Sequence, residues 1–240
     1  PWKQRTKYVS EIGVVFGQRS QLWWDVPVAD SFDLLADIYK ISPDKYKDNL
    51  KILTEILDLK EFLSVPLRQL SLGQRMRAEL AASLLHDPKV LFLDEPTIGL
   101  DAVSKLAIRD FIKRINKDKK VTIILTTHDM NDIEALTDRL ILIGKGRILY
   151  DGNMQVIKKK FDKYRELTVE FLPHEIPIEI ENTEILSWSS QRAKYRRDGE
   201  KIGIAGVLDV LSRELEIKDM MTTSCSIEEV IADLYKEYEI

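Results

Sequence analysis

The sequence predicts an α/β fold built on a parallel sheet, followed by a small α+β domain. Two short apolar runs, "VLFL" at 90–93 and "VTIIL" at 121–125, each end in polar residues and are separated by an amphipathic helical pattern over 102–117. Strand, helix and strand in this order are typical of a parallel sheet with crossover connections. Continuous apolar runs are typical of strands buried on both faces. After about residue 163 the pattern changes to several short strands.

The segments around this unit complete a predicted first domain over residues 1–162. Residues 11–18, "EIGVVFGQ", predict a strand. From about 28 to 88 the pattern is helical and interrupted by prolines, which predicts a helical subdomain. A short helix is expected over 131–138, and the segment "RLILIGKGRILYDG" that follows predicts a hairpin turning at its glycines.

Residues 163–240 are predicted to form a separate α+β domain. Its expected elements are strands at 166–172, 184–189, 193–197 and 217–222, and helices at 207–215 and 227–238. Ser226 and Glu229 have the spacing of a capping box at the start of the last helix. The acids and bases of this domain are spread along the segments and do not converge, so we expect a module without catalysis.

Composition excludes several kinds of protein. The net charge of the 240 residues is −4, so no overall basic field favours nucleic acid as a partner. The single cysteine, Cys225, excludes an intrachain disulfide and a cysteine metal cluster. No apolar run approaches the roughly 20 residues needed to span a bilayer. If this protein serves a membrane, we expect another chain to span it.

Polar side chains gather where the predicted strands end. Asp94 and Glu95 follow the run at 90–93, His128 follows the run at 121–125, and Gln18 ends the first strand. Ligands of open α/β sheets bind at the carboxyl ends of the strands. A carboxylate such as Asp94 suits Mg²⁺ in a phosphate site, and the adjacent Glu95 is free to polarise a water molecule.

The segment "LSLGQ" at 70–74 opens a predicted helix in an unusual way. Ser71 and Gln74 have the spacing of a capping box, whereas Gly73 in the first turn weakens a helix by about 1 kcal/mol relative to alanine. A helix N-terminus suits an anion, and glycine lets the anion come close to the backbone. An ordinary capped core helix that tolerates a glycine remains the alternative at this point.

Taken in order, these segments resemble the ATP-binding cassette (ABC) family over about residues 8–155. The matching segments are the Q-loop "GQ" at 17–18, the signature "LSLGQ" at 70–74, the Walker B segment "VLFLDE" at 90–95, the D-loop "GLD" at 99–101 and the switch segment "TTHD" at 126–129. The resemblance implies a P-loop NTPase-like cassette. "WWDVPV" at 23–28 and a short α+β extension are similar to the ATPase subunits of ABC-2-type exporters.

The resemblance implies ATP and Mg²⁺ as cofactors and a role for each residue at the strand ends. Asp94 would support Mg²⁺, and Gln18 would sense the metal and the attacking water. Glu95 would be the general base, and His128 would contact the γ-phosphate. Phosphoryl transfer depends mostly on such positioning and charge.

The resemblance also implies partners. Two cassettes of the family pair head to tail, so Ser71, Gly73 and Gln74 would face the nucleotide of a second ATPase subunit, in a homodimer or a heterodimer. Asp101 would link the two sites. A transmembrane permease subunit is the other implied partner, with Trp23-Trp24 expected to meet it. The protein would then be cytoplasmic and peripheral on the inner face of the cell membrane.

The sequence departs from the family in lacking the phosphate loop (Walker A), GxxxxGK[ST]. The pair Gly144-Lys145 is followed by Gly146 and fails this pattern. In the family the loop precedes the Q-loop, and the start "PWKQRTK" reads as mid-protein, so we expect an N-terminal truncation and a fragment that is inactive alone. The alternatives are a nucleotide-inert regulatory or scaffold module, and a soluble cassette protein acting on ribosomes or DNA.

Overall fold

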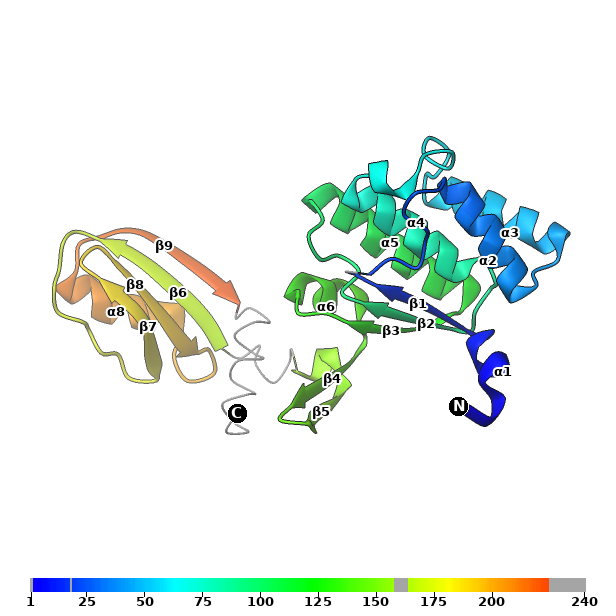
Figure 1. Cartoon of the computed structure of the whole chain (residues 1–240). Coiled ribbons are helices and arrows are strands. Elements are labelled where there is room, and N and C mark those ends of the chain that lie inside the picture. Colours follow the sequence, from blue (N-terminus) through cyan, green and yellow to red (C-terminus); the bar gives the residue numbers. More distant parts are fainter. Residues whose placement is uncertain (1, 18, 158–163, 225–240) are drawn as a thin grey trace. The chain divides into compact units, whose positions relative to one another are not determined.

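The computed structural model describes residues 2–17, 19–157 and 164–224 (Figure 1). Contacts within the chain divide it into two units, Pro1–Leu136 and Thr137–Ile240. The sequence places its boundary later, between 162 and 163, so that the predicted hairpin falls in the first domain. That boundary stays a prediction.

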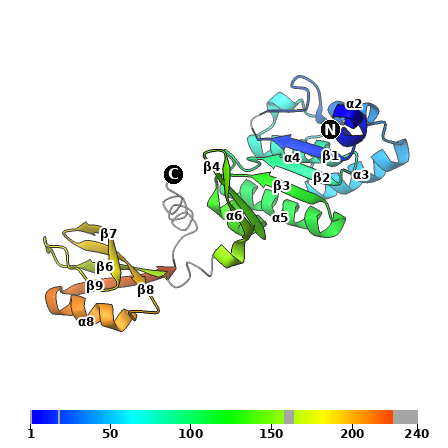
Figure 2. The ribbon, with the colours of Figure 1, turned by 90° about the horizontal axis from the view of Figure 1, so that it is seen from below.

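A parallel sheet of three strands forms the centre of the first unit. Its strands are β1 (Ile12–Phe16), β2 (Val90–Asp94) and β3 (Thr122–Thr126), in the order β1-β2-β3. The last residues of the three strands, Phe16, Asp94 and Thr126, lie in register. The parallel sheet predicted from the sequence is therefore confirmed, and the carboxyl ends of the strands form one edge (Figure 2).

Helices flank this sheet on one side and supply most of the core. They are η1 (Trp2–Gln4), α1 (Arg5–Val9), α2 (Val28–Tyr39), α3 (Pro43–Ile56), η2 (Leu67–Gln69), α4 (Leu72–Leu84), α5 (Ala102–Lys119) and α6 (Met130–Leu136). The elements α2 to α4 form the predicted helical subdomain. The interruptions predicted at prolines are present. Ser42 is the N-cap residue of α3, Pro43 is its first residue, and Pro66 directly precedes η2. Proline suits these first positions because it lacks the N–H that a helix start leaves unbonded.

The expectation of strands buried on both faces is wrong. One face of the sheet packs on the helices and buries Val15, Leu91 and Leu93, and Figure 1 shows α4 and α5 over this face. On the opposite face Phe16 is 50% exposed and Ile124 is 47% exposed. A strand with apolar residues on both faces can therefore have one face that no described part of this chain covers.

The second unit begins with the predicted hairpin. β4 (Arg139–Gly144) pairs antiparallel with β5 (Arg147–Asn153). Lys145 and Gly146 both have positive φ, 46° and 72°, which is the backbone of the tight turn that matches the twist of a hairpin. Arg139 and Asp151 join the two strands with two hydrogen bonds of 2.7 and 2.8 Å.

A four-stranded antiparallel sheet with one helix follows in the same unit. Its elements are β6 (Tyr164–Phe171), β7 (Thr183–Ser189), β8 (Arg192–Asp198), α8 (Ile204–Glu214) and β9 (Ile217–Ser224), with strand order β7-β8-β6-β9. Leu167, Tyr195 and Leu211 are fully buried between the sheet and α8. These elements confirm the predicted α+β character. The predicted final helix, its Ser226–Glu229 capping box and Cys225 lie outside the described residues.

No helix in the described part of the chain is both long and apolar enough to cross a membrane.

Candidate functional site

The carboxyl edge of the first sheet brings together the polar residues that follow its strands. The Thr126 hydroxyl donates a hydrogen bond of 2.5 Å to Oδ1 of Asp94. The backbone N–H of Glu95 donates to the carbonyl oxygen of Thr126 at 2.9 Å. Because β2 and β3 end in register, Asp94, Glu95 and the switch segment share one edge.

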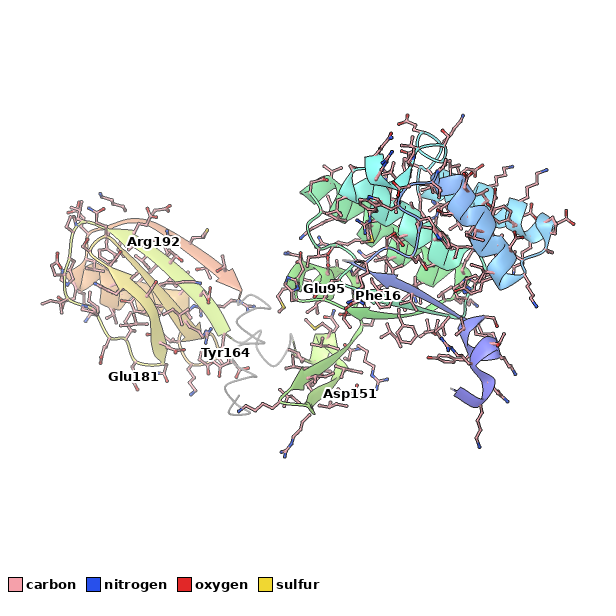
Figure 3. All side chains as sticks on the ribbon, viewed as in Figure 1. Phe16, Glu95, Asp151, Tyr164, Glu181 and Arg192 are labelled. Atoms are coloured by element: carbon pink, nitrogen blue, oxygen red, sulfur yellow. The ribbon has the colours of Figure 1, made fainter. Side chains whose placement is uncertain are left out.

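Glu95 and His128 form a direct pair at this edge. Nδ1 of His128 lies 2.7 Å from Oε1 of Glu95, with the His128 side chain 75% exposed and the Glu95 side chain 26% exposed. The hydrogen bond with Glu95 raises the pKa of the His128 imidazole above its ordinary value. Figure 3 shows Glu95 beside the end of the sheet where Phe16 lies. The sequence-based expectation that these acids lie beside His128 is therefore confirmed for Glu95.

The backbone of Glu95 adopts a left-handed conformation, with φ of 51°, which is uncommon for a residue other than glycine. Gly17 makes room for it. The Gly17 N–H donates to the Asp94 carbonyl at 2.7 Å, and a Cβ on Gly17 would lie 2.4 Å from the carbonyl oxygen of Glu95. The glycine of the Q-loop therefore shapes the backbone of the Walker B acids. Gln18 itself lies outside the described residues.

The start of α4 has the predicted capping box. The Gln74 N–H donates to Oγ of Ser71 at 3.2 Å, and the Ser71 N–H donates to Oε1 of Gln74 at 2.9 Å. The Ser71 oxygen serves as an acceptor here, so its hydroxyl hydrogen can still be donated elsewhere. Gly73 lies against α5, because a Cβ there would be 2.6 Å from Oγ of Ser104.

Asp101 caps α5. One carboxylate oxygen accepts from the N–H groups of Val103 and Ser104 at 3.0 and 2.9 Å, and the other accepts from the Ser104 hydroxyl at 2.6 Å. The bonds with Ser104 lower the pKa of Asp101. Ser104 thus joins Asp101 to the side of α4 where Gly73 lies. Among the described residues, no hydrogen bond or ion pair links this group to Glu95 or His128.

Sequence reasoning missed a buried polar cluster behind the switch segment. Asp132 is fully buried and accepts hydrogen bonds from Thr97, from Thr127 at 3.3 Å and from Arg109 at 2.6 Å. This cluster joins the turn after Glu95 to α5 and α6. Thr97 lies between the segments at 90–95 and 99–101, but its partner is 35 residues away, so no local pattern indicates the pair.

A second pair lies beside this cluster. Nζ of Lys105 is 2.6 Å from Oδ2 of Asp129, and this hydrogen bond lowers the pKa of Asp129 to about 2. Asp129 directly follows His128, so the pair ties the switch segment to α5.

Comparison with known proteins gives consistent matches. The family described as "ABC transporter" matches residues 1–98. The ABC transporter ATP-binding protein NatA of Bacillus subtilis (strain 168) is 28% identical over 153 residues, which cover 64% of this chain and 62% of NatA. The cholesterol transporter ABCA5 of Mus musculus is 27% identical over 237 residues, which cover 92% of this chain and 14% of ABCA5.

The solved structures include cbiO1 from Clostridium perfringens, described as part of the ABC transporter complex cbiONQ. It is 29% identical, with a TM-score of 0.58, and the match covers 66% of each chain. The chain spans less than two thirds of the length of NatA, and a much smaller share of ABCA5.

Proposed function

Because this chain carries an ATPase domain of the ABC transporter family, we propose that it is the ATP-binding and ATP-hydrolysing subunit of a membrane exporter. The observation that carries the proposal is the Glu95–His128 pair, 2.7 Å apart, at the carboxyl edge that also presents Asp94. A general base, a neutral or charged donor and a carboxylate for a hard cation are the groups that phosphoryl transfer to water needs.

The oxygen donors at this edge fit Mg²⁺. Asp94 is exposed and accepts a hydrogen bond from Thr126, and Mg²⁺ in phosphate sites usually takes one or two carboxylates together with phosphate oxygens and water. When bound, the ion would neutralise charge that develops on the phosphate oxygens. Asp94 and Thr126 would hold the ion. The proposal that Gln18 senses the ion and the attacking water rests on the family resemblance.

Glu95 would accept the proton of the attacking water. For this it must be released from its hydrogen bond with His128, whose Nδ1 it now engages. His128 would turn to the γ-phosphate and donate a hydrogen bond to it. A protonated imidazole is the better donor to an anion.

We further propose that the phosphate loop of this ATPase lies outside these 240 residues. The sequence contains no GxxxxGK[ST] segment, so neither its nest of N–H groups nor its lysine is present for the β-phosphate. The outer edge of β3 is unpaired within the described residues and offers a place for a further strand. We use "complete cassette" for these residues together with that loop, and we expect these residues alone to be inactive.

Two partners belong to the proposal. Ser71, Gly73 and Asp101 lie together at the starts of α4 and α5 without contact to Glu95, which supports a role toward the nucleotide of a second ATPase subunit. Trp23 and Trp24 are 40% and 51% exposed. Large aromatic side chains left at a surface favour a partner, and we propose a permease subunit at the cytoplasmic face of the cell membrane.

The substitution Glu95→Gln in the complete cassette tests the function. It keeps the shape of the side chain and removes the base, so turnover should fall by at least ~100-fold while Mg-ATP binding remains, and an ATP-bound dimer should accumulate. Glu55→Gln, on the exposed side of α3, is the matched control and should behave as wild type. Hydrolysis by the Glu95 variant at a near wild-type rate would show that Glu95 is not the base.

A further inference from the structure

The helix α4 holds a buried carboxylate that the proposed chemistry does not use. Glu79 is 3% exposed and accepts three hydrogen bonds from two consecutive residues that lie 58 and 59 positions earlier in the chain. The Ser20 hydroxyl donates to Oε1, the Gln21 N–H donates to Oε2 at 3.2 Å, and the Gln21 side-chain amide donates to the Glu79 carbonyl at 3.2 Å. One glutamate therefore fixes both the backbone and the side chains of this short segment.

Arg75 makes a second connection one turn earlier on the same helix. Its guanidinium carbon lies 5.1 Å from the centre of the Trp24 ring, a cation–π distance. Residues four apart lie on the same face of a helix, so Arg75 and Glu79 present one face of α4 to the segment 20–24. Ser71 caps the start of this helix and Gly73 lies in its first turn, on the N-terminal side of Arg75.

The segment 20–24 also contacts elements other than α4, since the Trp24 carbonyl oxygen accepts from the Arg68 N–H of η2 at 3.1 Å. Oγ of Ser20 also accepts from the Leu22 N–H at 3.0 Å, so Ser20 connects Glu79 to the backbone two residues further along. Beyond these bonds, the Trp23 N–H donates to Oγ of Ser31 on α2 at 3.3 Å. The indole surfaces of Trp23 and Trp24 remain largely exposed.

The two oxygens of the Glu79 carboxylate accept from two different donors of the segment. Oγ of Ser20 also lies 3.2 Å from the Leu22 carbonyl oxygen, so a glutamine could keep the contact by donating to Ser20 and accepting from Gln21, whereas leucine, of similar size, supplies neither acceptor. Burial raises the pKa of Glu79, and the hydrogen bonds from Ser20 and Gln21 and the charge of Arg75 oppose this rise. A buried acid kept in place by these contacts has a positional role.

We propose that Glu79 is a positioning residue that joins the segment Ser20–Trp24 to α4, so that displacement of the two tryptophans moves Ser71 and Gly73 with them. The consequence for transport rests on the proposed function, in which a permease contacts Trp23 and Trp24. The mechanical connection itself depends only on the contacts within this chain.

Hydrogen exchange at the Gln21 amide in the complete cassette tests the connection directly. In Glu79→Leu this amide should exchange at least ~10-fold faster, as expected for the loss of a hydrogen bond to a charged acceptor, while α2 and α3 keep their protection. Asp58→Asn is the matched control, since it weakens another contact of α4, the ion pair of Arg77 with Asp58, and should leave Gln21 unchanged. Unchanged Gln21 exchange in Glu79→Leu would overturn the inference.

The change in hydrogen exchange when Mg-ATP is added is the second measurement. Mg-ATP should change the exchange of residues 21–24 in the wild type. Glu79→Leu should bind Mg-ATP and show little of this change. Ser20→Ala, which removes one hydrogen bond only, should lose part of it. Combining the two substitutions should add little, because both remove the same contact.

A full response in the Glu79 variant, or simple addition of the two effects, would overturn the proposed coupling. If the wild type binds no Mg-ATP, the proposed function fails, and the exchange of Gln21 alone still decides whether Glu79 holds the segment.

Discussion

Replacing Gly17 by alanine should damage catalysis as well as stability. The glycine directly precedes the Q-loop glutamine and lies against the backbone of the two acids. A Cβ at this position would be 2.4 Å from the Glu95 carbonyl oxygen and 2.9 Å from that of Asp94. Ordinary contacts of this kind begin at about 3.4 Å, so the two segments must separate by about 1 Å.

The magnitude follows from this displacement. An added methyl group in a tightly packed place typically costs about 1–3 kcal/mol of stability. Glu95 has little room to adjust, because its φ of 51° is already in the left-handed region. A shift of about 1 Å in a catalytic group can lower a rate by about 100-fold. Turnover should therefore fall by about this factor.

The assay compares turnover, Mg-ATP affinity and thermal stability of the complete cassette and its Gly17→Ala variant. Gly203→Ala is the matched control, because nothing lies within 4 Å of the position that its Cβ would occupy. Turnover of Gly17→Ala within a few-fold of wild type, in a folded protein, would refute the view that Gly17 sets the position of Glu95.

Three further predictions concern other parts of the chain. Trp24→Ala in the assembled transporter should lower the substrate transported per ATP hydrolysed, and a loss of stability above about 1 kcal/mol with transport unchanged would instead assign Trp24 to packing. Deleting 164–240, the second sheet with its helix, should leave the Mg-ATP affinity of the complete cassette unchanged, and loss of binding in a folded deletion would contradict this. Burial lowers the pKa of His86 below its ordinary 6.5, so the unfolded chain binds more protons and the free energy of unfolding should decrease as pH falls below about 6.5. Chemical denaturation at pH 5 and 8 checks this, and the difference should shrink in His86→Gln.

Local sequence patterns predicted the parts of the site that depend on neighbouring residues. The spacing of Ser71 and Gln74 predicted a capping box, and the pair is found with both hydrogen bonds. Apolar runs that end in acids or in "TTHD" predicted strands with a common carboxyl edge, and Asp94 and Thr126 end in register. The glycines at 144–146 predicted the hairpin turn.

Contacts between distant segments could not be predicted in this way. Glu79 follows Ala78 and precedes Leu80 in a helix pattern, and its burial depends on Ser20 and Gln21, which no local rule brings near it. Asp101 was assigned to a link between subunits by resemblance, whereas within this chain it caps α5. An aspartate directly before a predicted helix is a sequence pattern that indicates such a cap. The proposed link between subunits stays a prediction.

Binding of Mg-ATP to the 240-residue chain, beside the complete cassette, tests the central claim most directly. The claim is that Asp94, Glu95 and His128 form one part of an ATP site whose phosphate loop lies elsewhere. Isothermal titration and phosphate release should show no binding and no turnover for the 240 residues, checked for folding by thermal melting, and both for the complete cassette. Tight binding with turnover by the 240 residues alone would contradict the claim and indicate a phosphate site among residues that these motifs do not include.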